Sequence, residues 1–299
     1  MRSALSILTR EAFKREALPD ALLWWLAADG MSGWYRFLRR GLEDYVGGRD
    51  AAAVLIADIC RPMFLAHYER LRRAYPRLPH PEENASALGL VMGGLGFSAF
   101  HAKGRFVYGG ILGVPRNALE QLRAQRVLEA IPVKARWEEM TTHLGEYLIA
   151  LTQELPNRGL PRANAILGKL CFDAGARYAE NARRQFRLPR TPESAVETLR
   201  MTEYIFRVNP EHWSGVNHAA GSAYIEGTAC PWYTANGWSM MHCGIFGQFQ
   251  SGIASVFGLS YMLSQTIPKH GGHTCRVDLK PLVQVRKKSE PFAPGQASK

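Results

Sequence analysis

Between residues 212 and 268 the sequence contains a single formally charged side chain, Glu226, although the whole chain has 37 basic and 26 acidic residues. A solvated surface would carry more charge, so this run is expected to fold inside a hydrophobic core. It still holds reactive and aromatic side chains: His212, His218, His242, Cys230, Cys243, Trp213, Trp232 and Trp238. Polar groups in such a setting are typical of a pocket. The run therefore limits the C-terminal half to a fold that encloses a cavity.

The chain has 299 residues, enough for one large domain or two ordinary ones. Its five cysteines are widely spaced and odd in number, which argues against a disulfide framework. No secretory signal is recognisable, so a cytoplasmic location is expected. The segment closest to a transmembrane helix, residues 85–102, is uncharged but interrupted by glycines, and a buried position is expected for it.

The formal net charge of +11 favours an anionic partner or an acidic substrate. The basic residues are spread along the chain, and no nucleic-acid-binding motif accompanies them. We therefore expect a small-molecule substrate, with an anionic group in agreement with the charge, and neither nucleic acid nor a membrane as partner. Whether the two halves pair within one chain or across a homodimer is left open.

The first 200 residues are predicted to be mainly helical. Apolar residues at helical spacing indicate helices over residues 51–75, 137–155 and 162–186. Pro62 is expected to kink or split the first of these, because it removes a backbone donor. Thr191-Pro192 is suited to open a further helix.

One pattern occurs twice. Residues 52–85 can be laid over residues 163–195 if one residue is dropped at Pro76, and Cys60 then falls on Cys171. Both segments end in Arg-Leu-Pro. The match indicates an ancient duplication of a helix and its exit loop. Coincidence between two helices rich in Arg and Ala is the simpler alternative.

After residue 200 the sequence changes character. Strands are predicted over residues 203–209, 222–225, 261–267 and 274–279. A buried helix is predicted over residues 239–257, and Gly271-Gly272 favours a hairpin between the last two strands. Residues 286–299 are expected to form a disordered tail.

Several C-terminal motifs follow one another in a familiar order. A long helix holds Gly175 and Tyr178, Cys230-Pro-Trp232 follows the first strands, and an apolar helix carries Gln248-Phe249. The unit from Gln265 to Arg276 has a strand, a glycine turn and a strand. Over residues 160–280 this order resembles the L-2-amino-thiazoline-4-carboxylic acid hydrolase-like family. That family is similar in turn to the 4-vinyl reductase small-molecule-binding domain.

The resemblance implies an antiparallel sheet with packed helices around a small-molecule pocket, and hydrolytic chemistry. The chain departs from the family at Gln248, where the family has an aspartate, which weakens an acid or base role there. Domains of the 4-vinyl reductase type place extra cysteines just before the glycine turn. This chain has Ile267 and His270 at those positions, which disfavours a structural zinc.

Cys230, beside Trp232, is the candidate nucleophile, because a thiol can attack an sp² carbon when a base is near. A buried small hydrophobe is the alternative. His242 is the candidate general base, since its pKa lies near the operating pH. Its neighbour Cys243 is expected to contact substrate, although adjacent helix residues point about 100° apart.

Glu226, as an isolated acid, is the candidate general acid. Trp232, His218, Gln248 and Cys275 are expected to bind substrate, and His273 to take part in catalysis. The expectation is that no cofactor is required. The alternative is zinc held by His270, His273 and Cys275, whose spacing offers two imidazoles and a thiolate.

We therefore predict an α+β fold with a helix-rich N-terminal half and a C-terminal antiparallel sheet like that of 4-vinyl reductase domains. The expected division is a mostly helical domain over residues 1–155, an α+β domain over residues 156–285 and a tail over residues 286–299. The expected function is hydrolytic or lyase-like chemistry on a C–N or C–S bonded sp² carbon of a small heterocycle or amide-like molecule, in a biosynthetic setting. The alternative is a non-catalytic small-molecule sensor.

Overall fold

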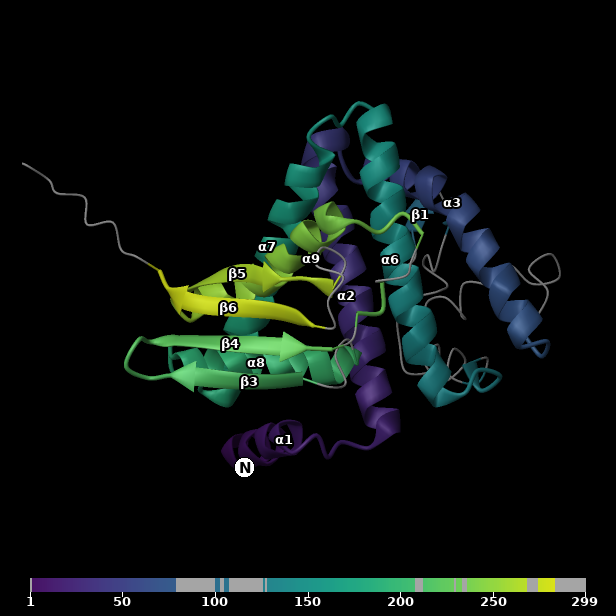
Figure 1. Cartoon of the computed structure of the whole chain (residues 1–299). Helices are drawn as coiled ribbons and strands as arrows, with labels where there is room; N and C mark the ends of the chain where they lie inside the picture. The colour runs from purple at the N-terminus through teal and green to yellow at the C-terminus, as the bar shows by residue number, and fades with distance from the viewer. Residues whose placement is uncertain are drawn as a thin grey trace, which may run out of the picture.

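The computed structural model describes residues 2–78, 100–102, 105–107, 126, 128–207, 212–228, 230–232, 236–267 and 274–282. The chain is α+β, as predicted, because helices make up most of this described part and a four-stranded antiparallel sheet lies in its C-terminal half. Figure 1 shows the sheet on one side of the molecule and the long helices beside it.

The N-terminal half supplies long helices and a short hairpin. They are α1 (Arg2–Lys14), α2 (Asp20–Val46) and α3 (Arg49–Ala74), followed by β1 (Phe100–Ala102) paired with β2 (Arg105–Val107). Pro62 does not split α3, contrary to one of the outcomes expected from the sequence. Pro62 and Asp58 both lie on the exposed face of α3, so water can solvate the Asp58 carbonyl, which lacks a helical donor.

The C-terminal half supplies the sheet and the helices that cover it. The helices are α6 (Val133–Asn157), α7 (Ala163–Phe186), α8 (Pro192–Phe206) and α9 (Met240–Val256). The strands are β3 (His212–Asn217), β4 (Ser222–Gly227), β5 (Leu259–Gln265) and β6 (Cys275–Pro281), in the order β3-β4-β6-β5. In Figure 1, α8 lies behind β3 and β4 while α9 lies against β5. Alternate residues of β4 are buried under these helices, as the two-residue period of a strand requires.

The strand predicted over residues 203–209 is wrong for residues 203–206, which form the last turn of α8. The Thr191 hydroxyl accepts a hydrogen bond from the Ser194 backbone N–H and so caps the helix. Ala195, Leu199 and Glu203 then recur at helical spacing and are all buried. Burial of this stripe outweighs the local β propensity of the residues around Ile205.

Helices α7 and α9 touch backbone to backbone at two glycines. A Cβ atom on Gly175 would lie 1.8 Å from the Phe249 carbonyl oxygen, and one on Gly252 would lie 2.0 Å from the Phe172 carbonyl oxygen. Both distances are far below any real Cβ contact, so only glycine fits at these positions. This contact fixes α9 in place, and α9 carries several residues of the site described below.

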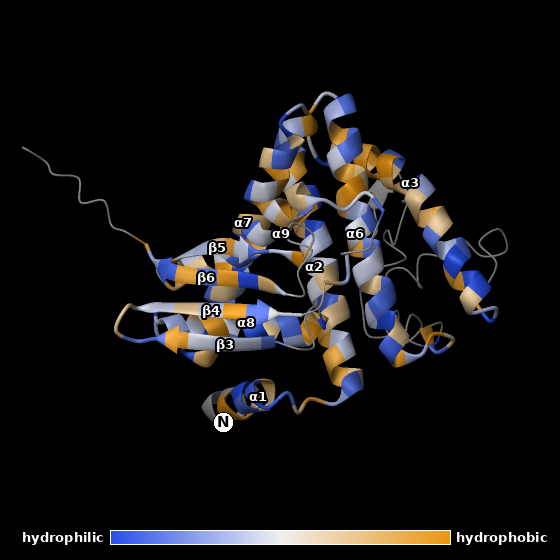
Figure 2. Cartoon of the chain, in the orientation of Figure 1, coloured by the Kyte–Doolittle hydropathy of each residue, from blue (hydrophilic) through white to orange (hydrophobic). Residues whose placement is uncertain are grey.

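Two hydrophobic clusters hold the fold together. The larger cluster joins α2, α3 and α6 to α7, so its packing crosses residue 155. The smaller cluster lies between the sheet and the helices α7, α8 and α9. The division into residues 1–155 and 156–285 stays a prediction, and the predicted tail lies outside the described residues. Figure 2 shows hydrophobic residues recurring along the helices between hydrophilic ones.

The two segments of the repeat have matching environments. Cys60 in α3 and Cys171 in α7 are both fully buried. After each helix, Leu78 and Leu188 are both buried in the Arg-Leu-Pro exit. These positions agree with a duplicated helix and exit loop.

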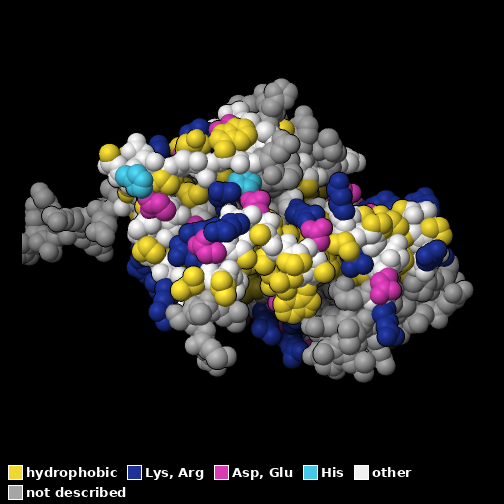
Figure 3. Space-filling view, turned by 90° about the horizontal axis from the view of Figure 1, so that it is seen from below, with side chains coloured by type: hydrophobic (Ala, Val, Ile, Leu, Met, Phe, Trp, Pro, Cys, Tyr) yellow, Lys and Arg dark blue, Asp and Glu magenta, His cyan; other side chains and the backbone are white. Residues whose placement is uncertain are grey.

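Within the described residues, α3 alone is long and apolar enough to cross a membrane, judged by length and composition. Half of its most apolar window is buried inside the protein, which is the property of a core helix. Segment 85–102 lies almost wholly outside the described residues. Figure 3 shows that Lys and Arg side chains are spread over one face of the molecule among acidic and hydrophobic ones, as the sequence suggested. The cytoplasmic location stays a prediction.

Candidate functional site

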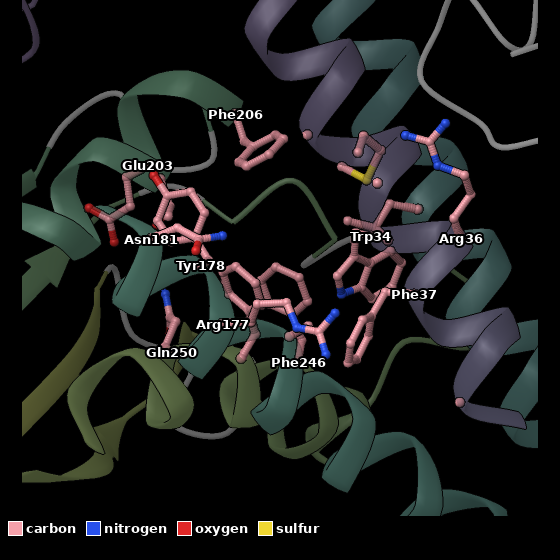
Figure 4. A pocket seen from close by; sticks show the side chains of 18 of the residues that line it. Trp34, Arg36, Phe37, Arg177, Tyr178, Asn181, Glu203, Phe206, Phe246 and Gln250 are labelled. Carbon is pink, nitrogen blue, oxygen red and sulfur yellow. The ribbon is translucent and has the colours of Figure 1, made fainter. Parts of the chain in front are cut away.

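A cavity of about 640 Å³ opens between α2, α6, α7, α8 and α9. Its volume lies in the range of small-molecule pockets, roughly 300–1,000 Å³. Aromatic side chains form much of its wall, and Figure 4 shows several of them around the central space: Trp34, Phe37, Tyr178, Phe206 and Phe246. The cavity can therefore enclose the apolar body of a small molecule.

One face of α2 supplies one side of this cavity. Gly30, Trp34, Phe37 and Arg40 all line the cavity and recur every three or four residues, which places them on a single helical stripe. The same spacing buries Leu38 and Leu42 on the neighbouring face, against the core. The N-terminal half thus contributes directly to the site.

Three arginines surround the opening of the cavity. Arg36 is half-buried, whereas Arg40 and Arg177 are exposed. The guanidinium carbon of Arg177 lies 4.9 Å from the centre of the Phe37 ring, a cation–π contact that Figure 4 shows beside Trp34. None of the three arginines has an ion-pair partner in the described part of the chain. The opening is therefore electropositive and suited to a carboxylate or another anion.

A second, smaller cavity of about 90 Å³ lies between α8, α9 and the sheet, and it is called the inner cavity below. It has room for a few water molecules or one small functional group. Its wall includes three thiols, those of Cys230, Cys243 and Cys275. Glu203, Phe246 and Gln250 line both cavities, so the two spaces meet at these side chains.

Glu203 is the acidic side chain at this junction. It is only 4% exposed, although it lies in the last turn of α8. Its Oε2 atom lies 3.9 Å from Nδ1 of His212, and Nε2 of His212 accepts a hydrogen bond of 2.9 Å from Nε of Arg200. Because Arg can only donate, Nε2 is the unprotonated nitrogen and the proton of the neutral ring lies on Nδ1, toward Glu203. A buried carboxylate backed by an oriented imidazole is a typical acid–base arrangement.

Gln250 and Tyr261 fix the polar side of the inner cavity. The Tyr261 hydroxyl donates a hydrogen bond of 2.6 Å to Oε1 of Gln250, which orients the amide with Nε2 as its donor. Burial raises the pKa of Tyr261, and the nearby Glu203 carboxylate raises it further. The phenol therefore remains protonated and keeps its role as a donor.

Two of the cavity thiols are held in the neutral form. Burial raises the pKa of Cys243, although Trp238 Nε1 donates a hydrogen bond of 3.2 Å to its sulfur. Burial likewise raises the pKa of Cys275, whose sulfur accepts a hydrogen bond of 3.3 Å from the Ile267 backbone N–H. The thiolate is the reactive form, so these two residues are wall residues at neutral pH.

Four of the predicted site residues come together at the inner cavity: Cys230, Trp232, Cys243 and Cys275. Trp232 stacks on Trp238 with ring centroids 4.8 Å apart, which forms a flat wall. The cysteines therefore line a hollow, as expected, whereas none of the expected histidines among the described residues lines it. The particular role of each cysteine, including Cys230 as nucleophile, stays a prediction.

The structure places Glu226 and His218 away from both cavities. Glu226 lies on β4 between Ile225 and Gly227, which line the inner cavity, so its side chain points to the opposite face of the sheet. There it forms an ion pair of 3.3 Å with Arg276. His218 is 81% exposed at the β3–β4 turn and pairs with Glu193 at 2.8 Å.

His242 and Gln248 also lie outside the cavities. Nδ1 of His242 accepts a hydrogen bond of 3.0 Å from the Ser239 backbone N–H, which completes a capping box at the start of α9. Its Nε2 lies 2.9 Å from the Thr152 hydroxyl, so both ring nitrogens are engaged in structural bonds. Gln248 is on the exposed side of α9, whereas Gln250, two residues on, reaches the site. His270 and His273, and with them the zinc alternative, lie outside the described residues.

Sequence reasoning missed Glu203, Gln250 and Tyr261, together with the aromatic and basic residues of α2. One available signal was the acid at position 203 on the stripe of Ala195 and Leu199, an otherwise apolar helical face. A buried charge on such a face marks a functional candidate. The contribution of α2 has no local signal, because it depends on packing between segments far apart in the chain.

Comparisons with known proteins do not extend this description. No protein-family model matches the chain, and no curated protein or solved structure matches it. The resemblance of residues 160–280 to the L-2-amino-thiazoline-4-carboxylic acid hydrolase-like family therefore stays a prediction.

Proposed function

We propose that this protein is a small-molecule enzyme that adds water to a C–N or C–S bonded sp² carbon of an anionic heterocycle or amide-like substrate. The observation that carries the proposal is the buried Glu203 carboxylate at the junction of a ligand-sized cavity and a small inner cavity. Burying a carboxylate costs stability, and buried acids in clefts are candidates for acid–base chemistry.

The larger cavity supports binding of the substrate body. Aromatic walls from α2 and α9 offer stacking surfaces, and Arg36, Arg40 and Arg177 at the opening offer donors for a carboxylate. A substrate anchored by its anionic end at these arginines would extend inward toward Glu203 and Gln250. The net charge of +11 favours the approach of such a substrate.

The inner cavity supports the chemical step. The Glu203 carboxylate accepts a proton from water as the water oxygen bonds to the sp² carbon and the π bond of that carbon opens. The protonated carboxyl then gives that proton to the leaving nitrogen or sulfur as its bond to the carbon breaks and a C=O bond forms. The balance is one added water, with Glu203 returned to its starting form. Gln250 is placed to donate a hydrogen bond to the substrate, and the Nδ1–H of His212 faces the carboxylate from behind.

In this proposal water, activated by Glu203, replaces the thiol as the attacking group. The raised pKa values of Cys243 and Cys275 disfavour a thiolate, and no histidine lines either cavity within the described residues. The resemblance to a thiazoline hydrolase family agrees with hydrolysis, and a biosynthetic role agrees with a small heterocyclic substrate.

The test compares wild type with Glu203→Gln, which keeps the size and polarity of the side chain but removes the base. Each protein is incubated with carboxylated thiazolines, amidines and small cyclic amides, and mass spectrometry follows the gain of one water. Glu193→Gln, an exposed acid outside both cavities, is the matched control. We expect turnover by wild type and the control and a loss of about 10²–10⁴-fold in Glu203→Gln. Equal turnover by Glu203→Gln would overturn the assignment.

A non-catalytic sensor is the second candidate. The neutral thiols favour it, because a cavity without a thiolate can hold a ligand unaltered. Tight binding of a carboxylated heterocycle by wild type, with no product from any compound tested, would support the sensor instead of the enzyme. Isothermal titration calorimetry with the same compounds gives this result directly.

A further inference from the structure

A second group of reactive side chains lies between α3 and α6, away from the two cavities. His67 projects from α3, and His143 and Glu146 project from α6. One ligand atom of each lies within 4.8 Å of the others, and the two imidazole ring centroids are also 4.8 Å apart. Both imidazoles are buried, and Glu146 is partly exposed.

From this geometry we infer that His67, His143 and Glu146 form a binding site for a divalent metal ion of the zinc class, with a water molecule as the fourth ligand. Two imidazole nitrogens and one carboxylate oxygen are a ligand set that such ions take together with water. The ion would connect α3 to α6. This site is independent of the hydrolytic function proposed above.

The two α6 ligands are spaced for this task. His143 and Glu146 are three residues apart, so they lie on one face of the helix. His67 faces them from α3, and its Nδ1 lies 3.2 Å from Oε2 of Glu146. Its Nε2, on the opposite side of the ring, lies 3.5 Å from Oε2 of Glu139, so Glu139 is outside the ligand set. His143 Nδ1 lies 3.9 Å from the same Glu146 oxygen.

These separations are close to what a metal needs. Bonds of about 2.0–2.1 Å in a tetrahedral site place neighbouring ligand atoms about 3.4 Å apart. The contact of His67 Nδ1 with Glu146 already satisfies this. His143 must approach the Glu146 oxygen by about half an ångström, and its ligand atom must also move closer to that of His67, which lies within 4.8 Å.

Arg70 supplies a positive charge at the same place. One of its guanidinium nitrogens contacts Oε1 of Glu146 and lies 3.1 Å from Nδ1 of His67. The Arg70 side chain is 44% exposed, so it can turn toward water when a metal ion enters. Arg70 therefore competes with the metal for Glu146 and His67, and its removal should strengthen metal binding.

The test uses Co²⁺ and Zn²⁺ alone, added to the full chain after treatment with a chelator and a reductant. Bound Co²⁺ reports its ligands by absorption: we expect one ion per chain with tetrahedral ligand-field bands and without a sulfur-to-cobalt charge-transfer band. A charge-transfer band would place the ion on cysteine and overturn the inference, as would the absence of binding at micromolar metal.

Two variants complete the test. Glu146→Gln should weaken Zn²⁺ binding at least about tenfold, and Arg70→Gln should strengthen it. Glu193→Gln is the control and should bind as wild type does. If Glu146→Gln fails to fold by circular dichroism, Arg70→Gln decides alone, because equal or weaker binding contradicts the competition. None of these measurements depends on turnover, so failure of the hydrolytic proposal leaves them interpretable.

Discussion

The contact between α7 and α9 predicts that two glycine-to-alanine changes in one helix have opposite effects on stability. At Gly252 the added Cβ would lie 2.0 Å from the Phe172 carbonyl oxygen and 2.8 Å from the Ala176 backbone nitrogen. To reach the ordinary contact of 3.4 Å, the helices must separate by about 1.4 Å. Backbone atoms cannot rotate away, so the whole helix pair has to shift.

The magnitude follows from two opposing contributions. Overpacking of a core costs about 1–3 kcal/mol, and a rigid backbone contact belongs at the upper end. Alanine gains about 1 kcal/mol over glycine in helix propensity. Gly252→Ala should therefore lose about 2 kcal/mol of unfolding free energy, or roughly 3 °C in Tm for a chain of 299 residues.

Gly244→Ala is the matched control, because the same helix has nothing within 4 Å of a Cβ at that position. It should gain up to about 1 kcal/mol, a rise of a few degrees in Tm. Thermal unfolding followed by circular dichroism at one protein concentration measures both variants. If Gly252→Ala melts at or above the wild-type temperature, α7 and α9 do not touch as described.

Three further predictions concern titration and capping. The folded-state pKa of His143 is lowered from 6.5 to about 4, so between these pH values the unfolded chain binds more protons than the folded chain. The contribution of neutral His143 to stability is therefore complete above pH 6.5 and is lost as the pH falls toward 4. The loss is on the order of 2–3 kcal/mol by urea unfolding, and His143→Gln should flatten this acid limb. His242→Ala should cost about 1 kcal/mol of stability, because α9 loses its cap, and ligand affinity measured by calorimetry should be unchanged. Loss of turnover without loss of stability would instead indicate that His242 takes part in catalysis. At neutral pH, Cys243 and Cys275 should react with iodoacetamide more slowly in the folded chain than in urea, and the reaction rate should rise with pH. Peptide mass spectrometry measures both rates, and equal rates in the folded and unfolded chain would contradict the burial of these thiols.

The sequence was sufficient to locate the inner cavity but not to complete it. The uncharged run identified Cys230 and Cys243 because a buried wall excludes charge, and composition records that directly. Cys275 was identified by the strand, glycine turn and strand unit that ends at Arg276. It misplaced Glu226, since an acid on a strand can face either side and only the register of β4 against β6 decides which. His242 was read as a base because its cap partner at Ser239 was not considered.

Local sequence patterns could not predict the larger cavity. Trp34 and Phe37 look like ordinary core residues of an amphipathic helix, and their position opposite Phe246 arises only when α2 packs beside α7 and α9. The pair of His67 and His143 was missed for the same reason, because the two residues lie on different helices far apart in the sequence. The helices themselves were predicted well, since their periodicity extends over many residues.

Side chains along β6 alternate between the two faces of the sheet, and this alternation limits how the protein can change over evolutionary time. Cys275 and Val277 face the inner cavity, whereas Arg276 and Asp278 form ion pairs on the other side of the sheet. A slip of β6 by one residue against its neighbours would present a guanidinium and a carboxylate to the interior and turn the thiol outward. Insertions and deletions of one residue within β6 should therefore be rare over evolutionary time, because they reverse which side chains the lineage presents to the inner cavity.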